Sequence, residues 1–118
     1  MKIEDIARIA HNANKSYCES LGDDSQLDWV LAPDWLRKST IKGVEFRLKN
    51  IHGTAEENHQ NWVKDKIQDG WKYGKIRDIE RKEHPNLTSW DNLPEFQKIK
   101  DVLFISIVDC LKEFITEC

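Results

Sequence analysis

The sequence predicts a mainly α protein, a compact bundle of about four helices with an irregular, aromatic-rich segment before the last helix. Apolar residues recur at three- and four-residue spacing along four stretches, which is the pattern of amphipathic helices. Capping residues, prolines and glycines stand at the ends of these stretches, and the helical period is lost between Trp71 and Asn92. Because the chain has 118 residues and no repeat or linker, we expect a single domain over residues 1–118.

The first two helices are marked most clearly at their ends. The first is expected to stop at Gly22, since glycine suits the left-handed position that follows a helix. Its apolar positions are Ile3, Ile6, Ala7, Ala10, Ala13, Tyr17 and Leu21. The second is expected to begin at Pro33, because a helix start leaves the amide that proline lacks unpaired, and to end near Asn50. Gly43 inside this helix costs about 1 kcal/mol relative to alanine.

The third helix begins at a capping box. In this motif the hydroxyl of Thr54 and the carboxylate of Glu57 each accept a hydrogen bond from the other residue's backbone amide. Gly70 is expected to end the helix. Between them lie His59, Trp62, Val63, Lys66 and Ile67.

The segment between the third and fourth helices is predicted to be irregular. Turn-forming residues stand at Gly74, at His84–Asn86 and at Asp91–Asn92. Between these turns there is room for two short strands, around Lys75–Ile76 and around Leu87–Ser89.

The final helix is expected to open at Pro94 and to run for about 20 residues to the C-terminus. A polar stripe, interrupted by Ile105, consists of Lys98, Asp101, Asp109, Lys112 and Thr116. Nearly every other position from 99 to 115 is apolar, so the helix needs cover on more than one side. The cover is either the other three helices or a second subunit, and the second option predicts a homodimer through this helix. A buried strand at Val102–Val108 is a third option, disfavoured because the pattern extends too far for a strand.

Charge and cysteine content exclude several classes of protein. A net charge of −3 argues against a protein that coats DNA or RNA, although Lys64–Glu83 carries seven bases and five acids. The longest apolar run, Val102–Ile105, is far shorter than the roughly 20 residues that cross a bilayer, and no secretory signal is recognised. Cys18, Cys110 and Cys118 show no paired spacing, so we expect reduced thiols, no structural metal and a cytoplasmic location.

Motifs for catalysis are absent from the sequence. It contains no glycine-rich phosphate loop, no nucleophile elbow and no HExxH pattern. The four histidines lie in unrelated contexts, and none stands at metal-ligand spacing from a cysteine or carboxylate. We therefore expect no cofactor and no enzyme, with a nucleotide-processing enzyme as the alternative.

Tryptophan is unusually frequent in this chain, at positions 29, 35, 62, 71 and 90. For any single tryptophan, packing in the core is the ordinary interpretation. The distribution favours a second one, because Trp62 shares a helix face with His59 and Lys66 and precedes an aromatic and basic stretch, residues 71–84. Rings interleaved with cations suit a planar base joined to phosphates, since bases stack on rings and anions need cationic partners.

These residues resemble the RyR domain (ryanodine receptor repeat) family, most strongly over residues 35–101. The motifs in chain order are His59-x-x-Trp62, Lys66-Ile67-x-x-Gly70-Trp71-x-Tyr73-Gly74, Asp78, Lys82-x-His84-Pro85 and Leu93. Their order and close spacing make the resemblance specific. The N-terminal part is similar to the stand-alone bacterial and phage form, through Ile6-Ala7-x-x-Ala10-His11, Asn14-x-x-Tyr17, Gly22-Asp23, Trp29, Trp35 and Gly43-Val44. Trp90 stands where many relatives carry tyrosine.

The resemblance implies a binding function and no channel activity. In animal calcium-release channels these repeats are cytosolic modules remote from the pore. In prokaryotes their association with nucleotide signalling and phage defence implies recognition of a nucleotide-derived ligand, by a sensor or by a phage sequestering protein. The alternative is a protein-interaction module that uses the same aromatic surface. Fold similarity alone does not fix the function.

The binding site is predicted where the third helix meets the Gly70–Pro85 segment. The candidate ligand-binding residues are His59, Trp62, Lys66, Trp71, Tyr73, Lys82 and His84. The rings are expected to stack on a base, and Lys82 and His84 to contact phosphates. In the competing interpretation Trp62, Trp71 and Tyr73 belong to the core. Secondary candidates are His11, Tyr17 and Trp29.

Overall fold

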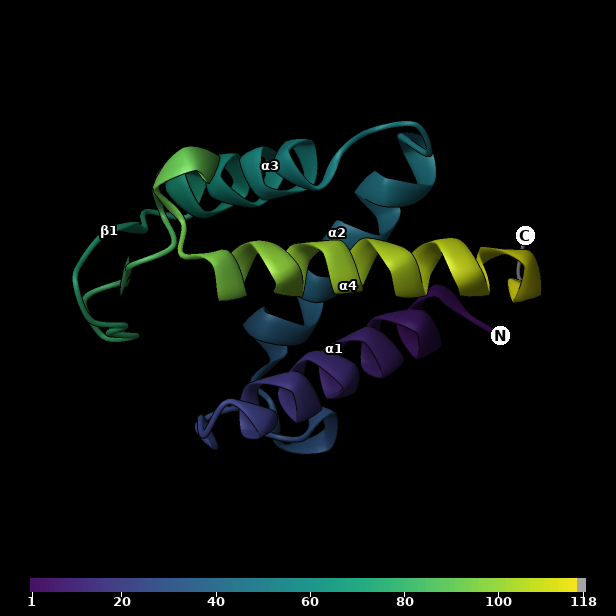
Figure 1. The fold of residues 1–118 in the computed structure, drawn as a ribbon, viewed down its shortest axis with the longest axis horizontal. Coiled ribbons are helices and arrows are strands. Elements are labelled where there is room, and N and C mark those ends of the chain that lie inside the picture. The colour runs from purple at the N-terminus through teal and green to yellow at the C-terminus, as the bar shows by residue number, and fades with distance from the viewer. Residues whose placement is uncertain (117–118) are drawn as a thin grey trace.

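In the computed structural model, which describes residues 1–116, one long helix lies at the centre of a four-helix bundle. This helix, α4 (Glu95–Leu111), packs against α1 (Ile3–Ser20), α2 (Asp34–Lys49) and α3 (Ala55–Gln68). Figure 1 shows α4 between α1 and α3, with α2 crossing behind it. The predicted mainly α bundle is confirmed, and no helix within the described part of the chain is long and apolar enough to span a bilayer.

Glycines end α1 and α3 as predicted. After α3, the amide of Trp71 donates to the carbonyl of Lys66 (2.9 Å), and the amide of Gly70 donates to that of Ile67 (3.0 Å). Gly70 has φ +89°, as does Gly22 after α1, where the same pair of hydrogen bonds forms. This is the Schellman arrangement, which needs a left-handed residue. It returns Trp71 to the last turn of α3, beside Lys66.

Close packing explains why α2 continues through Gly43. A Cβ atom at Gly43 would lie 3.2 Å from Cζ of Phe104 on α4. The glycine therefore lets α2 and α4 approach each other, and this contact offsets its low helix propensity. Pro33 and Pro94 cap α2 and α4 from one residue ahead of each helix.

Two short parallel strands precede α4, namely β1 (Lys72–Tyr73) and β2 (Glu83–His84). A Cβ atom at Gly74 would lie only 2.6 Å from the Cβ of Glu83. A residue larger than glycine would push the two chain segments apart at this point. The existence of two short strands was predicted correctly.

The predicted positions of the strands, Lys75–Ile76 and Leu87–Ser89, are wrong. Ile76 lies in a bend with its side chain 79% exposed, and Leu87 is buried directly after a turn. Apolar and β-branched content suggested those positions. The actual pairing depends on the close backbone approach at Gly74, which residue preferences do not report.

The final helix is shorter than predicted and is not a strand at Val102–Val108. A 3-10 turn, Lys112–Phe114, follows α4, and the chain then folds against the N-terminus. The amide of Thr116 donates to the carbonyl of Met1 (3.0 Å), and the terminal amine donates to the Thr116 hydroxyl (2.9 Å). Figure 1 shows both ends of the chain on one side of the bundle. The last two predicted helical residues, 117 and 118, lie outside the described range.

The dry core lies among α1, α2 and α4. Its buried members are Ile6, Ala7, Trp29, Val44 and Val108. Alanines at positions 7 and 10 are fully buried, so α1 presents a narrow surface to its neighbours. Cys18 is a buried free thiol and Cys110 an exposed one, whereas Cys118 lies outside the described residues. The expectation of three reduced thiols therefore stays a prediction.

The polar stripe of α4 faces inward at two of its polar residues and at Ile105, which interrupts it. Asp101 lines a cavity, Ile105 is buried and Asp109 pairs with Arg47 of α2. The exposed apolar residues of α4 lie on another face and are Phe96, Ile99 and Val102. The helix therefore buries part of its polar stripe and exposes part of its apolar surface.

Arg47 joins three parts of the fold. Its side chain is buried, and its Nε and Nη2 atoms donate to the two carboxylate oxygens of Asp109 at 3.0 and 2.9 Å. Its Nη1 donates to the carbonyl oxygens of Asn50 and Gly53 in the α2–α3 loop. The bidentate pairing lowers the pKa of Asp109 through the hydrogen bonds from Arg47.

We expect Arg47→Met to lower the free energy of unfolding by about 2–4 kcal/mol, because it leaves Asp109 and two loop carbonyls without their donor. The matched control is Arg37→Met, which removes an arginine that pairs with Asp34 within one turn of the same helix. The control should cost less than about 1 kcal/mol. Urea denaturation measures both, and equal losses would contradict the role of Arg47.

Candidate functional site

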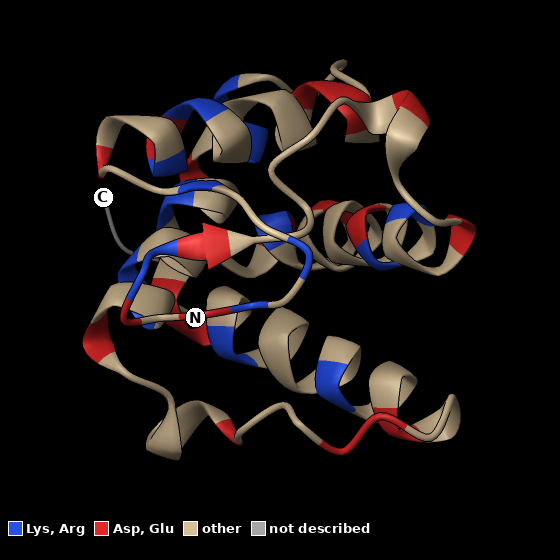
Figure 2. Cartoon of the chain, turned by 90° about the vertical axis from the view of Figure 1, so that its left-hand side faces the viewer, with Lys and Arg blue, Asp and Glu red and all other residues tan. Residues whose placement is uncertain are grey.

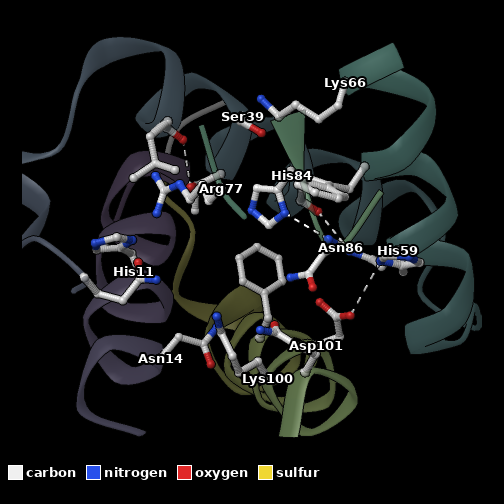
Figure 3. A pocket seen from close by; sticks show the side chains of 18 of the residues that line it. His11, Asn14, Ser39, His59, Lys66, Arg77, His84, Asn86, Lys100 and Asp101 are labelled. Atoms are coloured by element: carbon white, nitrogen blue, oxygen red, sulfur yellow. Dashed lines mark hydrogen bonds and ion pairs between the residues drawn. The ribbon is translucent and has the colours of Figure 1, made fainter. Parts of the chain in front are cut away.

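A cavity of about 240 Å³ lies where the four helices meet the segment 71–93 (Figure 3). This volume is slightly below the roughly 300–1,000 Å³ of sites for drug-sized molecules, so it suits the planar part of a small ligand. From α1, α2 and α3 the lining includes His11, Asn14, Trp35, Ser39, Gly43, Asn58, His59, Trp62 and Lys66. From the segment and α4 it includes Trp71, Arg77, His84, Asn86, Leu93, Gln97, Lys100, Asp101 and Phe104.

The structure brings five of the seven predicted residues together. These are His59, Trp62, Lys66, Trp71 and His84. Tyr73 lies outside the cavity, with its side chain 56% exposed. Lys82 also lies outside, and its Nζ donates to the carbonyl of Asp69 at 2.9 Å. Neither residue is placed to contact a ligand in this cavity.

Of the secondary candidates, His11 alone lines the cavity. Its Nε2 lies 2.6 Å from the carbonyl oxygen of Leu27, and its ring meets the edge of Trp29 at 5.7 Å between centroids. Trp29 belongs to the dry core, and Tyr17 does not reach the cavity. The core interpretation thus holds for Trp29.

Aromatic rings form a connected wall of the cavity. The rings of Trp35 and Trp71 are 5.4 Å apart between centroids, and the edge of the Trp62 ring meets His84 at 5.2 Å. His59 stacks on Trp62 at 5.9 Å. Trp71 is buried, so it is both a packing residue and part of the lining. Core packing and ligand contact are therefore compatible at this position.

Lys66 is a buried cation that has no anionic partner in contact. Its side chain is 4% exposed, and its Nζ lies 5.1 Å from the ring centroid of Trp35 and 5.9 Å from that of Trp71. Among residues 1–116, no carboxylate or carbonyl oxygen forms a hydrogen bond or ion pair with it. Burial lowers the pKa of the Lys66 ammonium. Cation–π contacts recover only part of the cost of removing such a charge from water.

Two further cations line the cavity without an ion pair to any described residue, Arg77 from the segment and Lys100 from α4. Several cations elsewhere on the helices do have carboxylate partners, as in the pairs Lys15–Glu19, Lys42–Asp65 and Arg47–Asp109. Figure 2 looks onto the end of the bundle that the segment covers, and basic and acidic residues alternate along its ribbon. Arg77 and Lys100, which have no ion pair with a described residue, thus both line the cavity.

His84 reports the positive potential inside the cavity. Burial is the main cause that lowers its pKa to about 4, and the charges of Arg77, Lys100 and Lys66 contribute to this shift. The ring is therefore neutral at pH 7. The backbone amide of Asn86 donates to its Nδ1 at 3.0 Å, which leaves the hydrogen on Nε2. His84 can thus donate a hydrogen bond to a ligand but supplies no positive charge.

Asp101 is the carboxyl group of the cavity. Burial raises its pKa to about 7, against a smaller opposite effect of Lys100. The nearest charged or titratable partner is His59, whose Nδ1 lies 3.9 Å from Oδ2 of Asp101 (Figure 3). The Nε2 of His59 donates to the carbonyl of Thr88 at 2.8 Å, which fixes the orientation of the ring. Asp101 itself accepts no hydrogen bond from the described residues.

One amide oxygen at the cavity is also unpaired. Oδ1 of Asn14 is buried and has no hydrogen-bond donor among the residues of the structure. Buried polar atoms in native proteins are normally paired, so each exception needs an explanation. A ligand or a bound water that enters the cavity would supply the missing donor.

Most of the remaining lining residues were not among the predicted candidates, and the rings and charged groups among them are Trp35, Arg77, Lys100, Asp101 and Phe104. Two of them were visible as polar positions on the otherwise apolar final helix, and Arg77 stands in the basic stretch. No local pattern shows that they point to the same space, because they come from α2, the segment and α4. Within residues 1–116 no group of three His, Cys, Asp or Glu side chains is placed to hold a metal ion.

The fold and the cavity define a small helical domain with a positively charged, ring-lined cavity. Residues 44–116 match the family model of the RyR domain. Because the match covers more than half of the chain, this protein belongs to the RyR domain family. The matched region contains α3, the segment 71–93 and α4, which form most of the cavity wall, whereas α1 precedes it.

The raised pKa of Asp101 predicts how stability depends on pH. The folded protein keeps this proton up to about pH 7, whereas the unfolded chain loses it near the ordinary pKa of 3.8. The carboxyl group therefore makes the free energy of unfolding fall as pH rises from about 4 to about 7. We expect Asp101→Asn to remove that fall, so that the variant gains stability over the wild type as pH rises through this window.

Urea denaturation at several pH values between 4 and 8 measures this difference. Comparison of variant with wild type is needed because His84, whose folded pKa is lowered to about 4, acts in the opposite direction below its unfolded value of 6.5. A constant difference across the range would show that Asp101 titrates as in the unfolded chain.

Proposed function

We propose that this RyR domain is a small-molecule binding module that recognises a nucleotide or a nucleotide-derived signal in the cavity. The observation that carries the proposal is Lys66, a buried ammonium between two indole rings that forms no hydrogen bond or ion pair with an anion of residues 1–116, although Asp65 and Asp69 lie near enough to act on it electrostatically. Such a group destabilises a fold unless a partner offsets its desolvation. An anionic ligand supplies that partner, and a phosphate matches the charge-assisted hydrogen bonds that lysine donates.

The remaining lining supports a nucleotide over a bare anion. Arg77 and Lys100 add two positive charges, so the cavity region favours a ligand with more than one negative charge. The rings of Trp35, Trp62 and Trp71 provide flat apolar surfaces for a base, and each base stacked on such a ring contributes about 1–3 kcal/mol. Amide groups of Asn14, Asn86 and others can pair with the polar edge of the base.

The size of the cavity limits the enclosed part of the ligand. A volume of about 240 Å³ suits a base or a nucleoside better than a whole dinucleotide. We therefore expect binding without turnover, as in a sensor or a sequestering protein in the cytoplasm of a bacterial host. A protein-interaction module is the competing function, and failure of every nucleotide to bind would favour it. Detection of a product after incubation would instead favour a nucleotide-processing enzyme.

We expect Lys66→Met to lower the affinity for nucleoside monophosphates at least tenfold, because it removes a charge-assisted hydrogen bond of about 1.5–3 kcal/mol. The melting temperature should stay equal or rise, since methionine fills the same space without a desolvated charge. Isothermal titration calorimetry and differential scanning fluorimetry with a panel of nucleotides measure the two effects.

The matched control is Lys64→Met, which removes an exposed lysine two residues away on the same helix. This variant should bind like the wild type. Equal affinity in the wild type and Lys66→Met would refute the anion-binding role of Lys66. Equal losses in both variants would show that only the overall charge of the protein matters.

We also propose that the protein forms a homodimer through α4. The observation in favour is the apolar surface of α4 that the other helices leave uncovered, where Phe96, Ile99 and Val102 are 44%, 42% and 51% exposed. A symmetric pairing of two such surfaces would remove them from water. Ile105, in contrast, is buried against the bundle and is not available for a partner.

We expect the wild type to sediment as a dimer at micromolar concentration and Val102→Glu to sediment as a monomer, because a charge would then face the partner's apolar surface. The control Gln68→Glu places the same charge on an exposed position of α3 and should remain dimeric. Analytical ultracentrifugation measures both, and a monomeric wild type would end this proposal.

A further inference from the structure

We propose that Asp101 selects the base of the ligand and that the base is guanine. The inference rests on the proposed nucleotide-binding function and names the substrate class of the same cavity. It assigns specificity to a residue that no sequence motif marked. The observations that support it are the position of Asp101, its lack of a hydrogen-bond donor, and the donors beside it.

Asp101 lies apart from Lys66 and Arg77 in the lining of the cavity. The charges of Lys66, Arg77 and Lys100 all lower the pKa of His84. Of these three cations, only Lys100 affects the pKa of Asp101. Figure 3 shows the His84 ring between Lys66 and Asp101. A nucleotide that spans the cavity can therefore place an anionic group near Lys66 or Arg77 and a base edge at Asp101.

The carboxyl group of Asp101 is available for such an edge. It lines the cavity, and no hydrogen bond reaches it from the part of the chain that the structure describes. His59, at 3.9 Å, is too distant for a hydrogen bond and is held in place by the Thr88 carbonyl. The Asp101 side chain is partly buried, so its oxygens are only partly hydrated, and a bound base can supply the donors that they lack.

Guanine offers the matching pattern of donors. Its N1–H and N2–H groups point in parallel and can donate to the two oxygens of one carboxylate. Its O6 atom, beside them, accepts hydrogen bonds, and Lys100, Asn86 and Gln97 of the lining carry donors. Adenine would instead direct its N1 acceptor at the carboxylate and has no carbonyl for Lys100. The pairing of acidic and basic side chains at this end therefore favours guanine.

The test measures the affinity for GMP, AMP and XMP by isothermal titration calorimetry at pH 8. The wild type should bind GMP at least tenfold more tightly than AMP or XMP, since a bidentate contact to a base typically discriminates by that factor or more. This comparison needs no variant. Similar affinities for all three nucleotides would overturn the assignment of guanine.

The variant Asp101→Asn should reverse the preference. An amide presents one donor and one acceptor, which match the C2 carbonyl and N1–H of xanthine but not the two donors of guanine. We expect GMP affinity to fall at least tenfold and XMP to bind more tightly than GMP. The matched control Asp91→Asn, at an exposed position ahead of α4, should keep the wild-type preference.

The outcomes separate this inference from the proposed function. If Lys66→Met abolishes binding of every nucleotide while Asp101→Asn leaves the base preference unchanged, the nucleotide site stands and guanine selection by Asp101 is wrong. If the wild type binds none of the three nucleotides, both are wrong. If the preference reverses in Asp101→Asn but not in the control Asp91→Asn, both the nucleotide site and guanine selection by Asp101 are supported.

Discussion

The architecture depends on how α4 turns two carboxyl groups toward the bundle. The central helix directs Asp101 and Asp109 toward the bundle, on either side of the buried Ile105. Asp109 is neutralised by the bidentate contact with Arg47, which also satisfies two carbonyls of the α2–α3 loop. Asp101 receives no such partner. One carboxyl group therefore joins helices, and the other is left with unused hydrogen-bonding capacity inside a cavity.

Along its length the bundle consists of a tightly packed region and a region that contains the cavity. The dry core of α1, α2 and α4 is filled by fully buried apolar side chains such as Ile6, Val44 and Val108. The cavity end contains the buried Lys66 and the partly buried Asp101, and neither forms a hydrogen bond with the described residues. A fold retains such groups at a cost in stability, and sites that bind ligands commonly show this cost. The core thus consists of packed apolar side chains, whereas the cavity end contains charged groups without hydrogen-bond partners.

Local signals in the sequence were sufficient for most of the helix boundaries. Gly22 and Gly70 end α1 and α3, because the turn after each helix needs a residue in the left-handed conformation. This need is local, so the sequence near the turn reveals it. The predicted positions of the strands were wrong because the pairing depends on how closely Gly74 approaches Glu83, which follows it by nine residues in the chain. The direction in which α4 turns its polar stripe depends on Arg47 of another helix, and periodicity alone could not reveal it.

The difference between local signals and contacts of distant segments also explains which cavity residues could be predicted. His59, Trp62, Lys66 and Trp71 belong to one helix and the turn that ends it, so their proximity follows from helical spacing and the Schellman turn. Arg77 and Asp101 reach the cavity only through tertiary packing. Because the two groups meet at one cavity, the complete lining combines rings and cations with a carboxyl group, a combination that the local motif alone does not contain. An anion alone satisfies Lys66, but only a ligand that also carries donors satisfies Asp101.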